Sequence, residues 1–307
     1  MYLNLSITIF FHRKSRSNGV SEIFLPKVDP SLLVLGIISA DNKIDLRNAQ
    51  RTTWLSKGLI QYRYLLDRET PALILENDTF GDLVFLNATH SGYATAYGEK
   101  LDLWFKYAWE HFPNVTLYGK ADDDVYVCAC QMYAKLHTLA HNRLYYGWMH
   151  SEWMTFTNRM KYHLYGKPLP LPDLGRHRYN FHDEMFVLVG RDLIEPLISR
   201  EYCYPKNCEG TFDDTRECED PDGCISNEHN WDTNIGDTSL VHWMNDTSGY
   251  NIDIVPGNKE MLHYQRGWFQ FDVYNDNLCD AHLVKHGLVT PDEMEWIFTQ
   301  KNGDCWW

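Results

Sequence analysis

Three adjacent aspartates, Asp122, Asp123 and Asp124, are the residues whose type and spacing point most directly to chemistry. They lie in the segment 117–127, whose apolar flanks indicate a β-strand, so Asp122 and Asp124 should point to one side and Asp123 to the other. Carboxylates suit Mg²⁺ or Mn²⁺, which keep few protein ligands and leave other positions to substrate phosphates. The triplet therefore indicates a metal site for a nucleotide diphosphate, with a solvent-exposed acidic turn as the alternative.

The composition limits the class of protein to which the chain belongs. With 307 residues, of which 44% are hydrophobic, it is long enough for one large domain or two fused halves. The formal net charge of -14 argues against a nucleic-acid partner, which would require a basic surface. A diphosphate would also be repelled by this charge, so we expect a metal ion and a few placed Arg or Lys residues at its site.

The cysteines and the glycosylation sequons both indicate an oxidising compartment. Half of the eight cysteines fall in the acidic insert 203–224 and suit disulfides, while zinc is the alternative: Cys203, Cys208, Cys218 and Cys224. The chain also has five Asn-x-Ser/Thr sequons, which can carry glycans in the secretory pathway: Asn4, Asn77, Asn87, Asn114 and Asn245.

The N-terminal region does not have the pattern of a membrane span. Residues 1–11 are apolar but reach only about half the length of a spanning helix. The basic run 12–16 follows them, whereas a signal peptide carries its charge first. We expect residues 1–30 to form a stem or linker. The protein is then either soluble or associated with the membrane only through an anchor upstream of this chain.

From residue 31 onward the sequence alternates strand and helix patterns. The continuous apolar run 32–38 is typical of a strand buried on both faces, and a long helical face spans 94–108 ahead of the Asp triplet. This rhythm predicts a mostly parallel α/β sheet with its ligand crevice at the carboxyl ends of the strands. We therefore predict a nucleotide-binding half, 31–143, and an acceptor-binding half, 144–307.

Two further constellations lie outside the triplet. Arg47 and Arg51 stand four residues apart and share one face of a predicted helix, where their guanidinium groups suit a diphosphate. A pair of surface arginines is the alternative. Asp237 opens an apolar helical pattern, and capping the helix would be its ordinary structural role.

Four short motifs occur in the following order along the chain: Arg47-x3-Arg51-x-Thr53-Trp54, Phe80-Gly81-Asp82-Leu83, Tyr97-x2-Lys100 with Trp104, and Lys120-x-Asp122-Asp123-Asp124-Val125-Tyr126-Val127. In this order they resemble the β1,3-galactosyltransferase family of Golgi glycosyltransferases, including its core-1 branch, over roughly residues 31–265. The resemblance implies a GT-A fold, with a Rossmann-like nucleotide-binding half fused to an acceptor-binding half. It also implies a UDP-sugar donor, Mn²⁺ or Mg²⁺, inversion at the anomeric carbon and a location in the Golgi lumen.

The resemblance also assigns roles by position. Residues at the UDP-sugar site would be Arg47, Arg51, Lys120, Asp122 and Asp123. The metal ligands would be Asp122, Asp124 and His263. Asp237 matches the aspartate that serves the family as catalytic base.

The sequence departs from the family beside the expected sugar pocket. Gly236 replaces the glutamate that precedes the base, and Phe181-His182-Asp183-Glu184 replaces a glycine-rich run. The leading function is an inverting β1,3-glycosyltransferase that moves a hexose, galactose by family frequency or an N-acetylhexosamine, to a glycan on a protein or lipid. The alternatives are a GT-A relative that binds UDP-sugar or glycan without turnover, and a metal-dependent phosphohydrolase.

Overall fold

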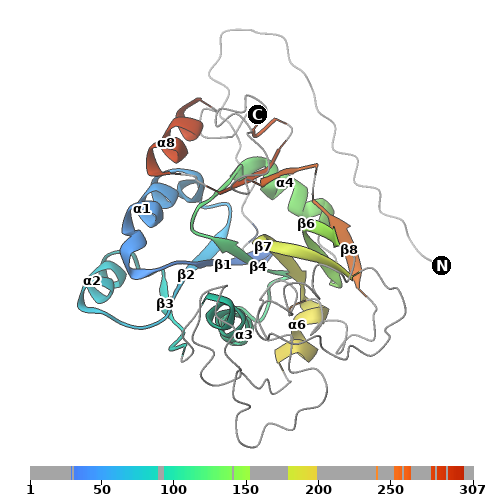
Figure 1. The fold of residues 1–307 in the computed structure, drawn as a ribbon, viewed down its shortest axis with the longest axis horizontal. Coiled ribbons are helices and arrows are strands. Elements are labelled where there is room, and N and C mark those ends of the chain that lie inside the picture. The colour runs from blue at the N-terminus through green and yellow to red at the C-terminus, as the bar shows by residue number, and fades with distance from the viewer. Residues whose placement is uncertain are drawn as a thin grey trace, which may run out of the picture.

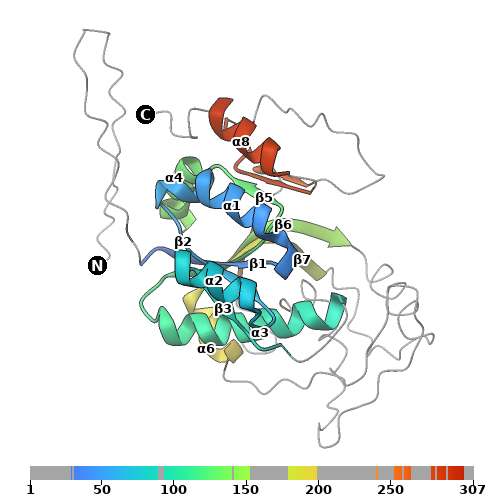
Figure 2. The ribbon, with the colours of Figure 1, turned by 90° about the vertical axis from the view of Figure 1, so that its left-hand side faces the viewer.

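The computed structural model describes residues 29, 31–88, 93–139, 142–152, 179–198, 240, 252–257, 259–263, 278–280, 282–287 and 290–300. A central sheet separates two helical layers, with α1, α4 and α8 on one face and α3 and α6 on the other (Figures 1 and 2). The helices are α1 (Ile44–Thr52), α2 (Pro71–Phe80), α3 (Tyr93–His111), α4 (Ala129–Leu139), α6 (Arg191–Ile198) and α8 (Pro291–Gln300), with the short 3-10 helices η1 (Asp41–Lys43) and η2 (Trp54–Lys57).

The main sheet has seven strands in the order β3-β2-β1-β4-β7-β6-β8. Its strands are β1 (Leu33–Ile38), β2 (Gln61–Leu66), β3 (Leu83–Phe85), β4 (Leu117–Asp122), β6 (Leu144–Glu152), β7 (Tyr179–Gly190) and β8 (Asp253–Pro256). The first four are mutually parallel, β7 runs antiparallel to both β4 and β6, and β8 is parallel to β6. The predicted α/β class with a mostly parallel sheet is confirmed.

A smaller sheet pairs β5 (Val125–Val127) with β10 (Val284–His286), which in turn pairs with β9 (Met261–His263). β5 follows β4 after a two-residue turn at Asp123 and Asp124. The predicted single strand over 117–127 is therefore wrong, because the chain leaves the main sheet after Asp122. The carboxyl ends of β1 and β4 lie side by side, since Ile38 is the register partner of Asp122.

The sheet is buried on both faces, as the apolar pattern of its first strand predicts. All six residues of β1 are buried, and their side chains divide between two apolar cores, one on each face. Trp104 of α3 packs onto Gly36 so closely that a Cβ there would lie 2.5 Å from the indole ring. The indole nitrogen donates to the carbonyl of Gly119 in β4 at 2.9 Å. This contact fixes α3 across the two central strands.

Among the described residues, no helix combines the length and the apolar character needed to cross a membrane.

Candidate metal centre

Two carboxylates and one imidazole meet beyond the carboxyl edge of the main sheet. Asp122 ends β4, Asp124 lies in the following turn, and His286 ends β10. One ligand atom from each of the three lies within 4.8 Å of the others, and all three side chains are half-buried. Two hard carboxylate oxygens and an imidazole nitrogen form a donor set that suits Mn²⁺. The residues present therefore fit the ion that the sequence predicts.

His286 reaches the aspartates through strand pairing. β10 runs antiparallel to β5 with His286 opposite Val125, the residue that follows Asp124. The His286 Nε2 atom lies 3.3 Å from Asp124 Oδ1 and 3.5 Å from Asp122 Oδ2. Burial would lower the pKa of His286, but the two carboxylates raise it to about 9. The protonated imidazole thus offsets the negative charge of the carboxylates. Metal binding requires the ring to lose this proton, because only the neutral imidazole coordinates an ion.

Lys120 keeps Asp122 ionised. Burial would raise the pKa of Asp122, but the charge of Lys120, with a smaller contribution from His286, holds that pKa below its usual range. The Lys120 Nζ atom lies 2.6 Å from Asp122 Oδ1, and the lysine side chain is fully buried. A carboxylate that is already ionised is ready to bind a cation. The further role of Lys120 at the UDP-sugar stays a prediction.

Asp123 is not part of the Asp122, Asp124 and His286 group and contacts the end of β1 instead, although it lies in a turn and not in the predicted strand. Its Oδ2 accepts a hydrogen bond of 2.8 Å from the Ser39 hydroxyl at the end of β1. Burial raises the pKa of Asp123 to about 6, with a smaller contribution from Asp124, although the Ser39 hydrogen bond acts in the opposite direction. Asp123 thus anchors the turn to β1, and its contact with the donor stays a prediction.

Arg47 is completely buried and bonded to the protein itself. Its Nε and Nη2 atoms donate to both oxygens of Glu76 in α2, at 2.8 and 2.6 Å. Its Nη1 atom donates to the Ser39 hydroxyl and the Ala40 carbonyl, at 2.9 and 2.6 Å. Arg47 therefore joins α1, α2 and the end of β1, and a contact with the UDP-sugar stays a prediction.

Arg51 extends the same ion-pair network. Its Nη2 atom lies 2.8 Å from Glu76 and 2.8 Å from Asp82, and its guanidinium lies 4.0 Å from the ring centre of Phe80. The surface alternative for the two arginines is wrong, because the Arg51 side chain is only 7% exposed and Arg47 is not exposed at all. Contact between Arg51 and the donor also stays a prediction.

Helix α1 holds the metal-binding turn through a second buried side chain. Gln50 Nε2 donates to the backbone carbonyls of Asp123 and Val125, at 3.0 and 3.2 Å. These two bonds restrain the turn on either side of Asp124. The sequence analysis identified the two arginines but not Gln50, because an uncharged side chain does not by itself indicate a role beside a metal ion or a phosphate.

His263, the metal ligand assigned from the resemblance, lies in β9 as the backbone register partner of His286. Its side chain is outside the described part of the chain, so its metal-binding role stays a prediction. The sequence analysis missed His286. Asp237, Gly236 and the insert 203–224 are also outside the described residues, as are the side chains of 181–184.

A family model described as Galactosyltransferase matches residues 45–203, which is more than half of the chain and includes the aspartate triplet. The chain belongs to the galactosyltransferase family. It is therefore a glycosyltransferase, as the sequence motifs predict, and the mostly parallel α/β sheet agrees with the GT-A fold expected of this family.

Two solved glycosyltransferases resemble the structure at low sequence identity. A glycosyltransferase involved in the glycosylation of the major capsid of PBCV-1 is 10% identical, with a TM-score of 0.43 over 87% of this chain and 98% of that chain. Mouse xyloside xylosyltransferase 1 in its apo form is also 10% identical, with a TM-score of 0.42 over 83% of this chain and 97% of that chain. No curated protein sequence matches the chain.

We predict that Glu76→Gln destabilises the protein because it leaves the buried guanidinium of Arg47 without its carboxylate. Breaking a buried pair from one side costs about 3–5 kcal/mol in the free energy of unfolding. Burial would raise the pKa of Glu76, but Arg47 and Arg51 lower it. The stabilisation is therefore complete above the unfolded-state pKa and is lost as the pH falls below about 4.5.

Urea denaturation of both proteins from pH 7 to pH 3 measures this difference. The difference in free energy of unfolding between wild type and Glu76→Gln should narrow as the pH falls. Glu69→Gln, a change at an exposed glutamate, should have little effect on this free energy at any pH. A gap that stays constant with pH would contradict the assignment to Glu76.

Proposed function

We propose that this glycosyltransferase is Mn²⁺-dependent, acts with inversion and forms a β1,3 linkage, moving galactose from UDP-galactose to a hydroxyl of a glycan on a protein or lipid. The observation that carries the proposal is the meeting of Asp122, Asp124 and His286 at the carboxyl edge of the parallel sheet, in a chain of this family. Parallel α/β sheets bind their ligands at this edge.

The residues of the metal centre have separate tasks in the proposed reaction. Asp122, Asp124 and His286 would hold Mn²⁺, which supplies neutralisation of the charge that develops on the leaving diphosphate. Lys120 keeps Asp122 ionised, and the hydrogen bonds from Ser39 and Gln50 fix the turn that presents Asp124. The ligands are thus held in place before the donor arrives, which limits the cost of ordering them.

Inversion requires one displacement at the anomeric carbon. The acceptor hydroxyl attacks from the side opposite the diphosphate, the bond between the carbon and the diphosphate oxygen breaks, and UDP leaves. The hydroxyl proton goes to a carboxylate base, for which we propose Asp237 on the strength of the family resemblance. General-base catalysis of this kind contributes typically about 10² to 10⁴-fold to the rate.

One experiment separates the candidate functions. The protein is incubated with Mn²⁺ and UDP-galactose, UDP-N-acetylglucosamine or UDP-N-acetylgalactosamine, with and without a glycan array. A β1,3-linked product from UDP-galactose supports the proposal, and a product from another donor corrects the sugar. Donor binding without transfer would identify a non-catalytic relative, and phosphate release without acceptor would identify a phosphohydrolase.

We predict that Asp124→Ala abolishes Mn²⁺-dependent UDP binding and leaves the fold intact. The carboxylate is a proposed metal ligand, and its side chain is 35% exposed, so its loss leaves no large cavity. Losing a ligand should cost more than the roughly 10 to 100-fold in metal affinity that loss of an outer-shell partner costs. Calorimetry with UDP and Mn²⁺ measures the effect, with the exposed Asp253→Ala as control. Unchanged affinity in Asp124→Ala would remove Asp124 from the site.

We predict that Asp237→Asn lowers turnover by about 10² or more with little change in donor affinity, because an amide can cap a helix but cannot accept a proton. Loss of a cap alone would cost about 1 kcal/mol of stability and leave turnover nearly intact. Steady-state kinetics at saturating donor distinguish the two roles. Retention of most of the turnover would place the base elsewhere, with Asp183 and Glu184 as the next candidates.

The proposed compartment is the Golgi lumen. Cys128 and Cys279 form a disulfide, and Cys130 is also disulfide-bonded, which supports a protein matured under oxidising conditions.

A protein of the secretory pathway can carry N-linked glycans on accessible sequons, and the structure distinguishes two of the sequons by their exposure. Asn114 is exposed in the turn after α3, where the Val115 amide donates to the Phe112 carbonyl. Asn77 is half-buried within α2, and its Oδ1 accepts from the Leu83 amide.

We therefore predict that protein secreted from a eukaryotic cell carries an N-linked glycan on Asn114 and none on Asn77. Enzymatic deglycosylation converts a glycosylated Asn to Asp, and peptide mass spectrometry detects the change. Asn114→Gln should remove one glycan from the intact mass, and Asn77→Gln should remove none. An unmodified Asn114 in secreted protein would contradict the prediction.

A further inference from the structure

The disulfide between Cys128 and Cys279 joins the two chain segments that build the metal centre. Cys128 immediately follows β5, the strand that begins directly after Asp124. Cys279 lies in the segment leading to β10, the strand that ends at His286. The two cysteines are separated by 151 residues in sequence, and both are buried. The bond thus links the segment that carries His286 to the segment that carries Asp124.

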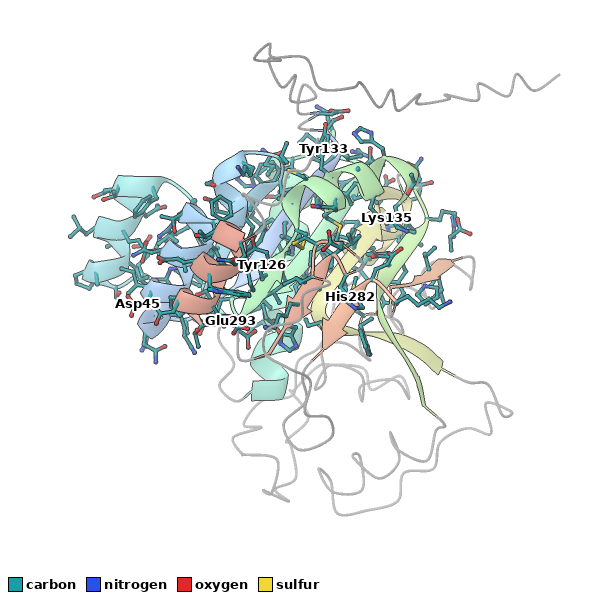
Figure 3. All side chains as sticks on the ribbon, turned by 90° about the horizontal axis from the view of Figure 1, so that it is seen from above. Asp45, Tyr126, Tyr133, Lys135, His282 and Glu293 are labelled. Atoms are coloured by element: carbon teal, nitrogen blue, oxygen red, sulfur yellow. A yellow bond between two sulfur atoms is a disulfide. The ribbon has the colours of Figure 1, made fainter. Side chains whose placement is uncertain are left out.

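The strand pair between the disulfide and the ligands is short. Each strand has three residues, and the pairs are Val127 with Val284, Tyr126 with Lys285, and Val125 with His286. The disulfide adjoins the first of these pairs and the metal ligands adjoin the last. Figure 3 shows this region from above, with Tyr126 on β5, His282 ahead of β10 and Glu293 on α8. A two-stranded pair of this length is marginal without further support.

Backbone hydrogen bonds continue the pairing up to the disulfide. The Cys128 amide donates to the Leu283 carbonyl at 2.8 Å, and the Cys279 amide donates to the His282 carbonyl at 2.8 Å. The backbones of Cys279 and His282 are therefore joined to each other, and Leu283 is joined to the residue that follows β5. A slip of β10 by one residue would break the bond between Cys128 and Leu283 and carry His286 away from Asp124.

Two further contacts hold β10 and the residue before it to other elements. The Glu260 carbonyl accepts from the amides of Leu283 and Val284, which joins β10 to the turn before β9. Lys285 forms an ion pair with Glu293 at the start of α8. Neither contact involves β5 or the turn that carries Asp124, whereas the Cys128–Cys279 bond joins the two ligand-bearing segments covalently within the described part of the chain.

We infer that the Cys128–Cys279 disulfide is a positioning element of the metal centre, which sets β10 against β5 and so holds the His286 imidazole beside Asp124. The inference rests on the proposed Mn²⁺ site. A ligand that occupies its place only part of the time reduces the apparent affinity in proportion to that fraction. Removing the disulfide should therefore weaken Mn²⁺ binding through His286, while Asp122 and Asp124 keep their own contacts.

A double-mutant cycle with Mn²⁺ affinity as the readout tests this coupling. Cys128→Ala/Cys279→Ala should bind Mn²⁺ about tenfold more weakly than wild type in calorimetry without donor. In a His286→Ala background the same pair of changes should alter the affinity by less than about twofold, because the group through which the disulfide acts is already absent. Circular dichroism establishes that each variant is folded.

A control variant separates positioning from general loss of stability. Leu193→Ala creates a cavity in the apolar core around α6, on the other face of the sheet, and should lower the melting temperature without changing Mn²⁺ affinity. If the alanine pair does not fold, Cys128→Val/Cys279→Ala fills more of the vacated volume and replaces it in the cycle.

Unchanged Mn²⁺ affinity in the folded disulfide variant would overturn the inference while leaving the proposed metal centre in place. The inference would also be overturned if the variant that combines His286→Ala with the two cysteine changes loses Mn²⁺ affinity by the product of the two separate losses. The disulfide and His286 would then act independently. Absence of Mn²⁺ binding by the wild-type protein would overturn the metal centre itself, and the inference with it.

Discussion

The buried ion pair between Arg47 and Glu76 is the interaction on which the arrangement of the site depends. It joins α1 to α2 and, through Ser39 and Ala40, to the carboxyl end of β1. Ser39 then binds Asp123, so one uninterrupted chain of contacts runs from Glu76 to the metal-binding turn. Buried pairs of this kind contribute little net stability but are costly to break, which suits a contact whose task is to hold geometry.

The metal centre balances its charges locally within an acidic chain. Lys120 and His286 lie beside the carboxylates of Asp122 and Asp124, while Asp123 accepts a hydrogen bond from Ser39 at the end of β1. The positive charges of Lys120 and His286 offset the repulsion between the carboxylates of Asp122 and Asp124. The turn thus divides the triplet into two ligands and one anchor, and the division follows from the direction in which each side chain leaves the backbone.

Local patterns were sufficient to predict most of the fold and part of the site. A few neighbouring residues are enough to recognise three of its features: the apolar run of β1, the helical face of α3 around Trp104 and the Asp triplet. His286 could not be found in this way, because it reaches the site through the pairing of β10 with β5, and its three-residue strand has no distinctive pattern. The burial of Arg47 was equally hidden, since its partner Glu76 lies on another helix.

The direction in which the chain enters the sheet has a consequence for how the enzyme meets its acceptor. Ser31 and Leu32 pair with Thr116 and Leu117 at the amino ends of β1 and β4, whereas the metal centre lies beyond the carboxyl ends. The chain therefore enters β1 at the edge of the sheet opposite the candidate metal centre. Substrates that approach the carboxyl edge therefore do not meet the backbone at Ser31 and Leu32, which lies at the opposite edge.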